Sequence, residues 1–220
     1  MLARRHDRLV EAATEAGPAA VPVVCDVTDE ASCRRAIEES AAALGGIDAV
    51  VYATGVGPLA RLADLDAATW RHAFDTNVIG ASLVTAAALP YLTESQGMAL
   101  YFSSVSASQT PPWPGLAAYA VSKAALDKLV DAWRAEHPAI GFTRVVVGDC
   151  SGGEGHSMTE FNAGWDTDLV REMHPIWSSR GYIAGNLLDP EELVRVIDQV
   201  LRSAPETSIP SVIVTPRSAG

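Results

Sequence analysis

The chain has 220 residues, of which 48% are hydrophobic, and its formal net charge is −11. This length fits one domain over residues 1–220, and the apolar content is sufficient for a core. The negative charge argues against nucleic acid or an anionic membrane as a partner. No run of about 18 apolar residues indicates a membrane-spanning helix, and the basic start has no apolar run typical of a secretion signal. The 3 cysteines share no Cys-x-x-Cys spacing, so we expect a reduced, cytoplasmic protein.

The first half of the chain alternates helical segments with short apolar strands. Thr28 or Asp29 can cap the second helix, because their side-chain oxygens accept hydrogen bonds from free amides at a helix start. Gly45-Gly46 ends this helix, and Pro90 breaks the next one. The predicted elements are a helical stretch over 2–16, a strand over 21–25, a helix from 28 or 29, a strand over 47–53, a long helix from 66 to Pro90 and a strand over 98–102.

The second half repeats the alternation and ends in a strand. Strands that are apolar throughout and alternate with helices indicate a parallel sheet covered on both faces. The predicted fold class is therefore α/β, a Rossmann-like doubly wound parallel sheet in a single domain. The predicted elements are a helix over 119–136, a strand over 142–147, a glycine-rich loop over 149–157, a weakly patterned helical segment over 158–179, a helix starting at Asp189-Pro190 and a strand over 211–215.

Tyr119 and Lys123 are four residues apart, which places them one turn apart on the same helix face. A lysine beside a tyrosine favours the phenolate, so the phenol exchanges its proton more readily near neutral pH. Lys123 and Lys128 are the only lysines in the chain, which makes a chance lysine here less common than usual. The alternative interpretation is a Tyr–Lys pair on a solvated helix face.

Four motifs in this order resemble the short-chain dehydrogenase/reductase family. The resemblance covers nearly the whole chain and implies an NAD(P)-dependent oxidoreductase that interconverts an alcohol and a carbonyl group in a small-molecule substrate. The motifs are Asp26-Val27 after an apolar run, Thr76-Asn77-Val78-Ile79-Gly80 in a helical stretch, Ser103-Ser104-Val105 at the end of a strand, and Tyr119-x-x-x-Lys123.

The resemblance implies a catalytic role for each of four side chains. Tyr119 would give or take the proton at the reacting oxygen, while Lys123 would lower the pKa of this tyrosine and hold the nicotinamide ribose. Asn77 would support an ordered water beside Lys123, and its alternative is an asparagine that bends the helix and bonds to backbone. We prefer Ser104, at a strand end, as the serine that orients the substrate oxygen, although the family's usual spacing before the tyrosine points to Ser106.

The resemblance also implies contacts with the adenine end of the cofactor. Asp26 would accept a hydrogen bond from the adenine amine, and Val27 would pack on the ring. Arg4 and Arg5 could meet a 2′-phosphate, which favours NADP, with NAD as the other candidate. The alternatives are that Asp26 is an acid near a helix start and that the arginines belong to a solvated helix start.

Two segments depart from the family pattern near the expected cofactor. The turn Tyr52-Ala53-Thr54-Gly55 replaces the family's usual Asn-Asn-Ala-Gly. Ala53 and Gly55 would still line the cofactor, since glycine permits close approach of the backbone, but the missing asparagine predicts a looser turn. The loop over 148–156 is rich in glycine and acidic residues, where the family usually has Pro-Gly and then Thr. The sequence therefore assigns no residues to the contacts with the nicotinamide.

The N-terminal segment lacks the glycine-rich turn on which the family places the cofactor phosphates. Leu2-Ala3-Arg4-Arg5 resembles the end of the family's second strand, so we expect a βαβ unit of about 30 residues to be incomplete. Two strand edges would then be unpaired. The open explanations are a late start codon, a fragment or a genuine short form. The alternative function is a cofactor-defective, non-catalytic relative that binds a ligand or a partner.

Three further interpretations concern metal, hydrolysis and assembly. No metal is expected, because the candidate ligands Asp149, Cys150, Glu154 and His156 match no zinc spacing. No Gly-x-Ser-x-Gly elbow supports a Ser-His-Asp hydrolase. The Ala- and Leu-rich helices that carry Asn77 and Tyr119 are expected to pair in a homodimer or homotetramer.

Three tryptophans either line an apolar substrate pocket or belong to the core: Trp113, Trp165 and Trp177.

Overall fold

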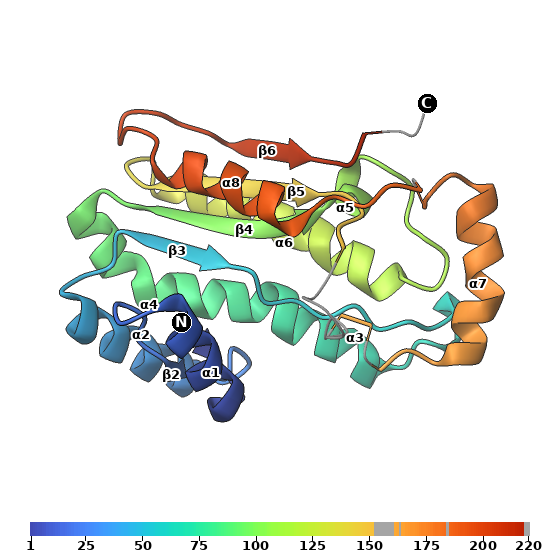
Figure 1. Cartoon of the computed structure of the whole chain (residues 1–220), viewed down its shortest axis with the longest axis horizontal. Helices are drawn as coiled ribbons and strands as arrows, with labels where there is room; N and C mark the ends of the chain where they lie inside the picture. The colour runs from blue at the N-terminus through green and yellow to red at the C-terminus, as the bar shows by residue number, and fades with distance from the viewer. Residues whose placement is uncertain (152–160, 163, 184, 218–220) are drawn as a thin grey trace.

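The computed structural model describes residues 1–151, 161–162, 164–183 and 185–217. Within them, helices and strands alternate along the chain (Figure 1). The elements are β1 (Leu2–Ala3), α1 (His6–Ala16), β2 (Val23–Val24), α2 (Glu30–Leu44), β3 (Ala49–Tyr52), η1 (Leu62–Asp64), α3 (Ala67–Phe74), η2 (Asp75–Ile79), α4 (Gly80–Ser95), β4 (Met98–Ser104), α5 (Val105–Ser108), α6 (Ala117–Glu136), β5 (Gly141–Val147), α7 (Thr167–Ser179), α8 (Pro190–Leu201) and β6 (Ser211–Val214).

The strands form parallel sheets, as the alternation of strands and helices predicts. A two-stranded sheet pairs β1 with β2, and a four-stranded sheet has the order β3-β4-β5-β6. Every pair in both sheets is parallel. The predicted α/β architecture with parallel strands is therefore confirmed, with the strands divided between two sheets instead of one.

Strand β3, at the edge of the larger sheet, and strand β1, in the smaller sheet, each have one side without a paired strand among the described residues. In the described residues, β3 pairs only with β4, and β1 pairs only with β2. Val51 of β3 is 42% exposed and Val24 of β2 is 50% exposed. Strands inside a doubly wound sheet are buried on both faces, so these valines are more exposed than those of an interior strand would be.

Helices cover both faces of the four-stranded sheet. Because successive residues of a strand point to opposite faces, Ala99 and Tyr101 of β4 pack in one cluster with residues of α2, α4 and α6. Leu100, between them, packs on the other face with α8. The α8 residues of that second cluster are Leu193, Ile197 and Val200. The chain thus has the doubly wound arrangement of layers.

Aspartates begin several of the helices. The side chain of Asp29, and not that of Thr28, caps α2 by accepting from the Ser32 amide at 2.7 Å. Asp66 caps α3 in the same way, and Asp189 precedes Pro190 at the start of α8, as predicted. Each carboxylate satisfies an amide that has no partner within the helix and adds a favourable charge at the positive end of the helix dipole.

Three predicted boundaries need correction. Leu2–Ala3 is a strand paired with Val23–Val24, so the first helix begins only at His6. Pro90 does not break its helix, because α4 continues to Ser95. Proline removes the hydrogen bond to the carbonyl four residues earlier, but here that residue, Ala86, is solvent-exposed. In the segment over 158–179, the structure describes a helix over Thr167–Ser179, and residues 158–160 and 163 lie outside the described residues.

The helices α3, η2 and α4 join into one continuous helical stretch over Ala67–Ser95. Its central turn, Asp75–Ile79, is π-helical, a rare form that is often found at functional sites. By length and composition alone this stretch could cross a membrane, although 44% of its most apolar window is buried inside the protein. Such burial is typical of a core helix packed against a sheet.

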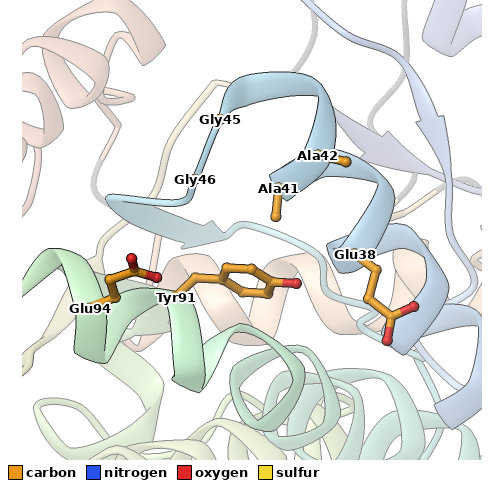
Figure 2. Close-up of a pocket in the computed structure, with 7 residues that line it drawn as sticks. All are labelled: Glu38, Ala41, Ala42, Gly45, Gly46, Tyr91 and Glu94. Carbon is orange, nitrogen blue, oxygen red and sulfur yellow. The ribbon is translucent and has the colours of Figure 1, made fainter.

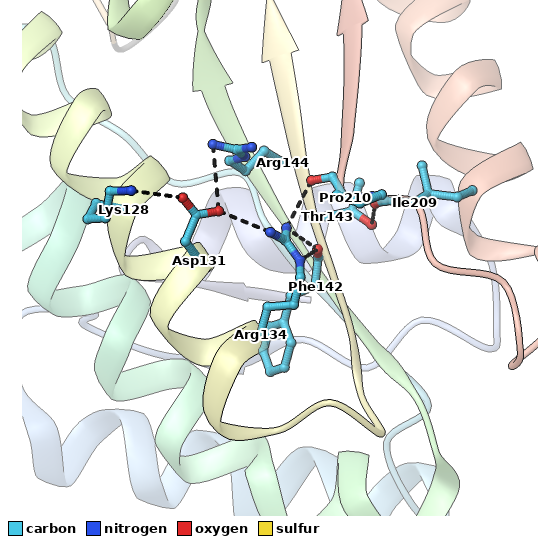
Figure 3. A network of polar contacts seen from close by, with 8 residues as sticks. All are labelled: Lys128, Asp131, Arg134, Phe142, Thr143, Arg144, Ile209 and Pro210. Carbon is cyan, nitrogen blue, oxygen red and sulfur yellow. Dashed lines mark hydrogen bonds and ion pairs between the residues drawn. The ribbon is translucent and has the colours of Figure 1, made fainter.

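An ionic network fixes α6 to the far end of the sheet (Figure 3). The Arg134 guanidinium donates to the Phe142 carbonyl at 2.7 Å and to the Pro210 carbonyl at 3.0 Å. Asp131 holds this arginine through a 3.0 Å contact and also lies 3.8 Å from Arg144. Hydrogen bonds from a charged donor are stronger than neutral ones, so this network helps to set the position of α6, which carries Tyr119 and Lys123.

Candidate functional site

Lys123 and Tyr119 lie on α6, near the carboxyl end of β4. The Lys123 ammonium is 5.8 Å from the centre of the Tyr119 ring and donates a 2.6 Å hydrogen bond to the Phe102 carbonyl. Lys123 is only 4% exposed. Burial disfavours the ammonium and lowers its pKa to about 8. The sequence prediction that these two side chains share one helix face is confirmed.

The pKa of the Tyr119 phenol is shifted upwards, opposite to the lowering that the sequence predicts. Burial raises the pKa of Tyr119, and a hydrogen bond with Ser104 opposes this effect. The Phe161 ring stands edge-on to the Tyr119 ring, with the ring centres 4.9 Å apart, and covers it. Because the Lys123 ammonium is directed at a backbone carbonyl, removal of the phenol from water outweighs the predicted stabilisation of the phenolate by the lysine.

Ser104 and Ser106 lie together beside the phenol. Their hydroxyl oxygens are 2.9 Å apart, and each residue is 8% exposed. Ser104 closes β4 and caps the short helix α5, and its hydroxyl is the one that acts on Tyr119 by lowering the pKa of the phenol. Ser104 thus lies at the strand end, as predicted, with Ser106 next to it, and the choice of Ser104 as the substrate-orienting serine stays a prediction.

Asn77 joins the π-helical turn to the loop after β3. Its side-chain oxygen accepts from the Val56 amide at 2.8 Å, and its nitrogen donates to the Val56 carbonyl at 2.9 Å and to the Ser122 hydroxyl at 2.8 Å. Asn77 is fully buried. Both polar atoms of its side chain are therefore hydrogen-bonded to protein atoms, as the helix-bending interpretation expects. The side chain also lies close to Lys123.

The turn after β3 is held more firmly than the missing asparagine suggests. The Tyr52 hydroxyl donates a 2.6 Å hydrogen bond to the Thr76 carbonyl, and Asn77 binds both backbone groups of Val56. Ala53 is exposed at this turn. A methyl group built on Gly55 would lie 3.3 Å from the Lys123 ammonium nitrogen, so the backbone here approaches the lysine more closely than most residues would allow.

The residues predicted for the adenine end lie at the carboxyl ends of β1 and β2. Asp26 accepts from the Thr28 amide at 2.9 Å and hydroxyl at 2.7 Å, and these bonds lower the pKa of its carboxyl group. Val27 packs over Gly80, where an added methyl group would be 3.1 Å from the valine Cβ. Arg4 and Arg5 are exposed beside β1, and Arg4 acts electrostatically on Asp26.

A row of aromatic rings runs outward from Tyr119. Phe161 packs on Trp165 with ring centres 5.4 Å apart, Trp165 on Trp177 at 6.0 Å, and Trp177 on Trp113 at 5.6 Å. Trp177 is 4% exposed and donates to the Pro114 carbonyl, so it is a core residue. Trp113 and Trp165 are half-buried. Trp177 therefore belongs to the core, and for Trp113 and Trp165 a place in an apolar substrate pocket stays a prediction.

The other candidate sites stand apart from this arrangement. A shallow depression of about 280 Å³ lies between α2 and α4, with the Tyr91 ring on its floor and Glu38 and Glu94 at its sides (Figure 2). It contains none of the predicted site residues. Of the metal candidates, Glu154 and His156 lie outside the described residues. Among the described residues no three His, Cys, Asp or Glu side chains gather as metal ligands would.

A nicotinamide cofactor fits this arrangement in part. Tyr119, Lys123 and Asn77 meet at the carboxyl ends of parallel strands, where open α/β sheets bind their ligands, and Gly55 leaves space beside them. The connections β1–α1 and β2–α2 contain no glycine. Neither can be the glycine-rich turn that cradles a pyrophosphate.

Sequence reasoning missed several partners of these residues. Val56 and Ser122, which hold Asn77, and Phe161, which covers Tyr119, are distant from them in the chain and belong to no motif. Asp127 was detectable, because it follows Lys123 by four residues on the same helix and is only 7% exposed. An acid at that spacing from a buried lysine is a signal for an electrostatic partner.

Comparison with known proteins gives a consistent family. Residues 1–142 match the family described as Enoyl-(Acyl carrier protein) reductase. The chain is 32% identical over 154 residues to 11-beta-hydroxysteroid dehydrogenase A of Sesamum indicum, a match that covers 67% of this chain and 44% of that protein. The chain thus spans less than half the length of this relative.

Solved structures agree with the sequence match. A short-chain type dehydrogenase/reductase from Mycobacterium marinum has a TM-score of 0.80 and 25% identity, covering 97% of this chain and 82% of that one. An alcohol dehydrogenase from the archaeon Thermococcus sibiricus, complexed with 5-hydroxy-NADP, has a TM-score of 0.78 and 21% identity, covering 97% and 83%. Together with the gathered Tyr119, Lys123, Asn77 and Ser104, the family match shows that this chain belongs to the short-chain dehydrogenase/reductase family.

Proposed function

We propose that the protein is an NAD(P)-dependent oxidoreductase that interconverts an alcohol and a carbonyl group, with Tyr119 as the proton donor or acceptor. The observation that carries this proposal is the convergence of Tyr119, Ser104 and Lys123 at the carboxyl end of β4. A phenol, a hydroxyl group and a cation at one place can bind a polarised oxygen and move a proton to or from it.

Each side chain has a distinct part in this proposal. The Tyr119 hydroxyl transfers the proton at the substrate oxygen, and the Ser104 hydroxyl orients that oxygen. The Ser104 hydroxyl opposes the effect of burial on the pKa of the phenol, and the Lys123 ammonium is the cation beside the phenol and the nicotinamide ribose. Asn77 holds the turn after β3 against Lys123. The nicotinamide group supplies or accepts the hydride when it is bound.

We propose NADP as the cofactor in preference to NAD. Arg4 and Arg5 lie at the carboxyl end of β1, close enough to Asp26 for Arg4 to influence its charge. Guanidinium groups in that position suit a 2′-phosphate, because they bind it with a planar pair of donors. The substrate is a small molecule, and the compartment that best fits the three free cysteines is the cytoplasm.

We expect the 220-residue chain alone to bind NADPH and NADH weakly. The connections β1–α1 and β2–α2 offer no glycine-rich turn for the pyrophosphate, and the sheet is open at β1 and β3. Isothermal calorimetry with both nucleotides measures this directly. A fusion that adds a glycine-rich strand–turn–helix unit before Met1 should bind NADPH more tightly and reduce ketones with it. Micromolar binding by the chain alone would show that such a unit is dispensable.

We also expect the protein to form a homodimer or homotetramer through the helices that carry Asn77 and Tyr119. Ile79, at the end of η2, is 47% exposed, and Val121, on α6, is 45% exposed. Large apolar side chains exposed on neighbouring helices are typical of a face that another molecule covers. Light scattering at micromolar concentration should give a mass of two or four chains, and a Val121→Glu variant should dissociate. A stable monomer in the unmodified protein would contradict this expectation.

A further inference from the structure

A second buried ionisable side chain lies behind Lys123 and has no part in the proposed reaction. Asp127 follows Lys123 by one helical turn on α6, and the two residues are 7% and 4% exposed. Aspartate and lysine are almost never buried to this extent unless they are paired. Residues four apart on a helix are neighbours on its surface, so the charge of Asp127 can act on Lys123 without a direct ion pair.

The other partners of Asp127 are few. Within the described residues, its Oδ1 and the Oγ of Ser103 are both buried and make no hydrogen bond of ordinary geometry. The groups that influence the Asp127 carboxyl are Ser103 on β4, Arg144 on β5, and Asp131 and Lys123 on α6. Arg144 also lies 3.8 Å from Asp131. Asp127 is therefore a buried carboxylate that Ser103 and Arg144 compensate most, with a smaller effect from Lys123.

The surroundings of Lys123 are equally limited. The ammonium faces the Phe102 carbonyl, the Tyr119 ring and the backbone of Gly55. Asp127 is the one residue whose charge is found to act on Lys123. A lysine in such a place loses its proton easily, because burial penalises the ammonium and a single carbonyl gives limited compensation.

We propose that Asp127 is a positioning residue for the candidate site, whose carboxylate keeps the Lys123 ammonium charged beside Tyr119. The proposal rests on the proposed function for its purpose, in which the charged lysine serves the phenol and the nicotinamide ribose. Its physical basis is independent of that function. Burial lowers the pKa of Lys123 to about 8, and the charge of Asp127 opposes this lowering.

The direction of the pH effect follows from these shifts. The ammonium is present below the pKa of Lys123 and is lost as the pH rises through that value. Removing the charge of Asp127 lowers the pKa further, so the ammonium is lost at a lower pH. A nearby opposite charge typically shifts a pKa by about one unit or more, which is about a tenfold change in the ionisation constant.

The chain offers a direct measurement, because Lys123 and Lys128 are its only lysines. In protein labelled with ¹³C at lysine Cε, a pH titration by NMR gives two signals, and the exposed Lys128, with 82% of its side chain accessible, serves as the reference. We expect Asp127→Asn to move the titration midpoint of Lys123 about one unit lower. The matched control is Asp131→Asn, which removes a carboxylate one turn further along α6 and should leave that midpoint unchanged.

An unchanged midpoint for Lys123 in Asp127→Asn would overturn the proposal, as would an equal shift in Asp131→Asn. If circular dichroism shows that Asp127→Asn does not fold, Asp127→Ser replaces it. This variant also removes the carboxylate charge but leaves a smaller polar side chain, so it should move the Lys123 midpoint in the same direction, and an unmoved midpoint again overturns the proposal. No cofactor or substrate is needed, so a protein without oxidoreductase activity would refute the proposed function and leave this measurement intact.

Discussion

Tyr119→Phe should reduce the turnover of an alcohol or ketone by at least about 10²–10⁴-fold, the usual contribution of a general acid or base. The variant loses the hydroxyl that transfers the proton but keeps the ring, which packs edge-on against Phe161. Nucleotide affinity should therefore change little. The measurements are the steady-state rates with NADPH over a panel of ketones, made on the fusion protein with the glycine-rich unit, and calorimetry with NADPH.

Tyr91→Phe is the matched control for this experiment. Tyr91 lies on α4 at the depression shown in Figure 2, whose lining includes neither Lys123 nor Ser104. The control loses the same oxygen atom from a different place, so it should keep the turnover of the parent protein. Undiminished activity in Tyr119→Phe would refute the proposed mechanism outright.

Asn77→Ala should lower the free energy of unfolding by about 2–4 kcal/mol. The substitution leaves the amide and carbonyl of Val56 and the hydroxyl of Ser122 without their partner, and each buried group that loses a hydrogen bond costs about 1–3 kcal/mol. Because Val56 is partly exposed, water can replace part of its lost hydrogen bonds. The expected loss of unfolding free energy is therefore smaller than three times the cost of one buried group. Urea denaturation followed by circular dichroism measures the change.

Asn186→Ala provides the comparison for Asn77→Ala. Asn186 is exposed, and its side chain donates a single 3.2 Å hydrogen bond to the Arg217 carbonyl. Surface substitutions of this kind usually change stability by less than about 0.5 kcal/mol. A loss at Asn77 no larger than the loss at Asn186 would mean that the loop after β3 finds other partners, and the role given to Asn77 would have to be abandoned.

Local sequence patterns predicted the elements that carry the candidate site. Tyr119 and Lys123 share a helix face because of their spacing, and Ser104 ends a strand whose carboxyl end meets the start of that helix. The meeting of these side chains follows from the parallel sheet, since the carboxyl ends of its strands lie at one edge.

What could not be predicted depends on contacts between distant segments. Leu2–Ala3 is a strand because it pairs with Val23–Val24, a long-range pairing that outweighs the local helical pattern, and only the resemblance to the end of the family's second strand indicated it. The direction of the Tyr119 pKa depends on its burial by Phe161, whose position no motif indicates. Asn77 is held by Val56 across the turn after β3, and only the folded chain brings these two residues together.

The division of the strands into two sheets also has a consequence for the motions of the protein. No strand pairing joins β1 and β2 to the larger sheet in the described residues, so the N-terminal segment is held to it by side-chain packing, chiefly of α2 on α4. A segment attached in this way can open as one cooperative unit without breaking a backbone hydrogen bond of β3, β4, β5 or β6. Amide exchange in β1 and β2 is thus governed by a local equilibrium, whereas exchange in β4 and β5 requires the whole molecule to unfold. The residues predicted to hold adenine belong to the part that opens, and those predicted to carry the chemistry belong to the part that stays closed.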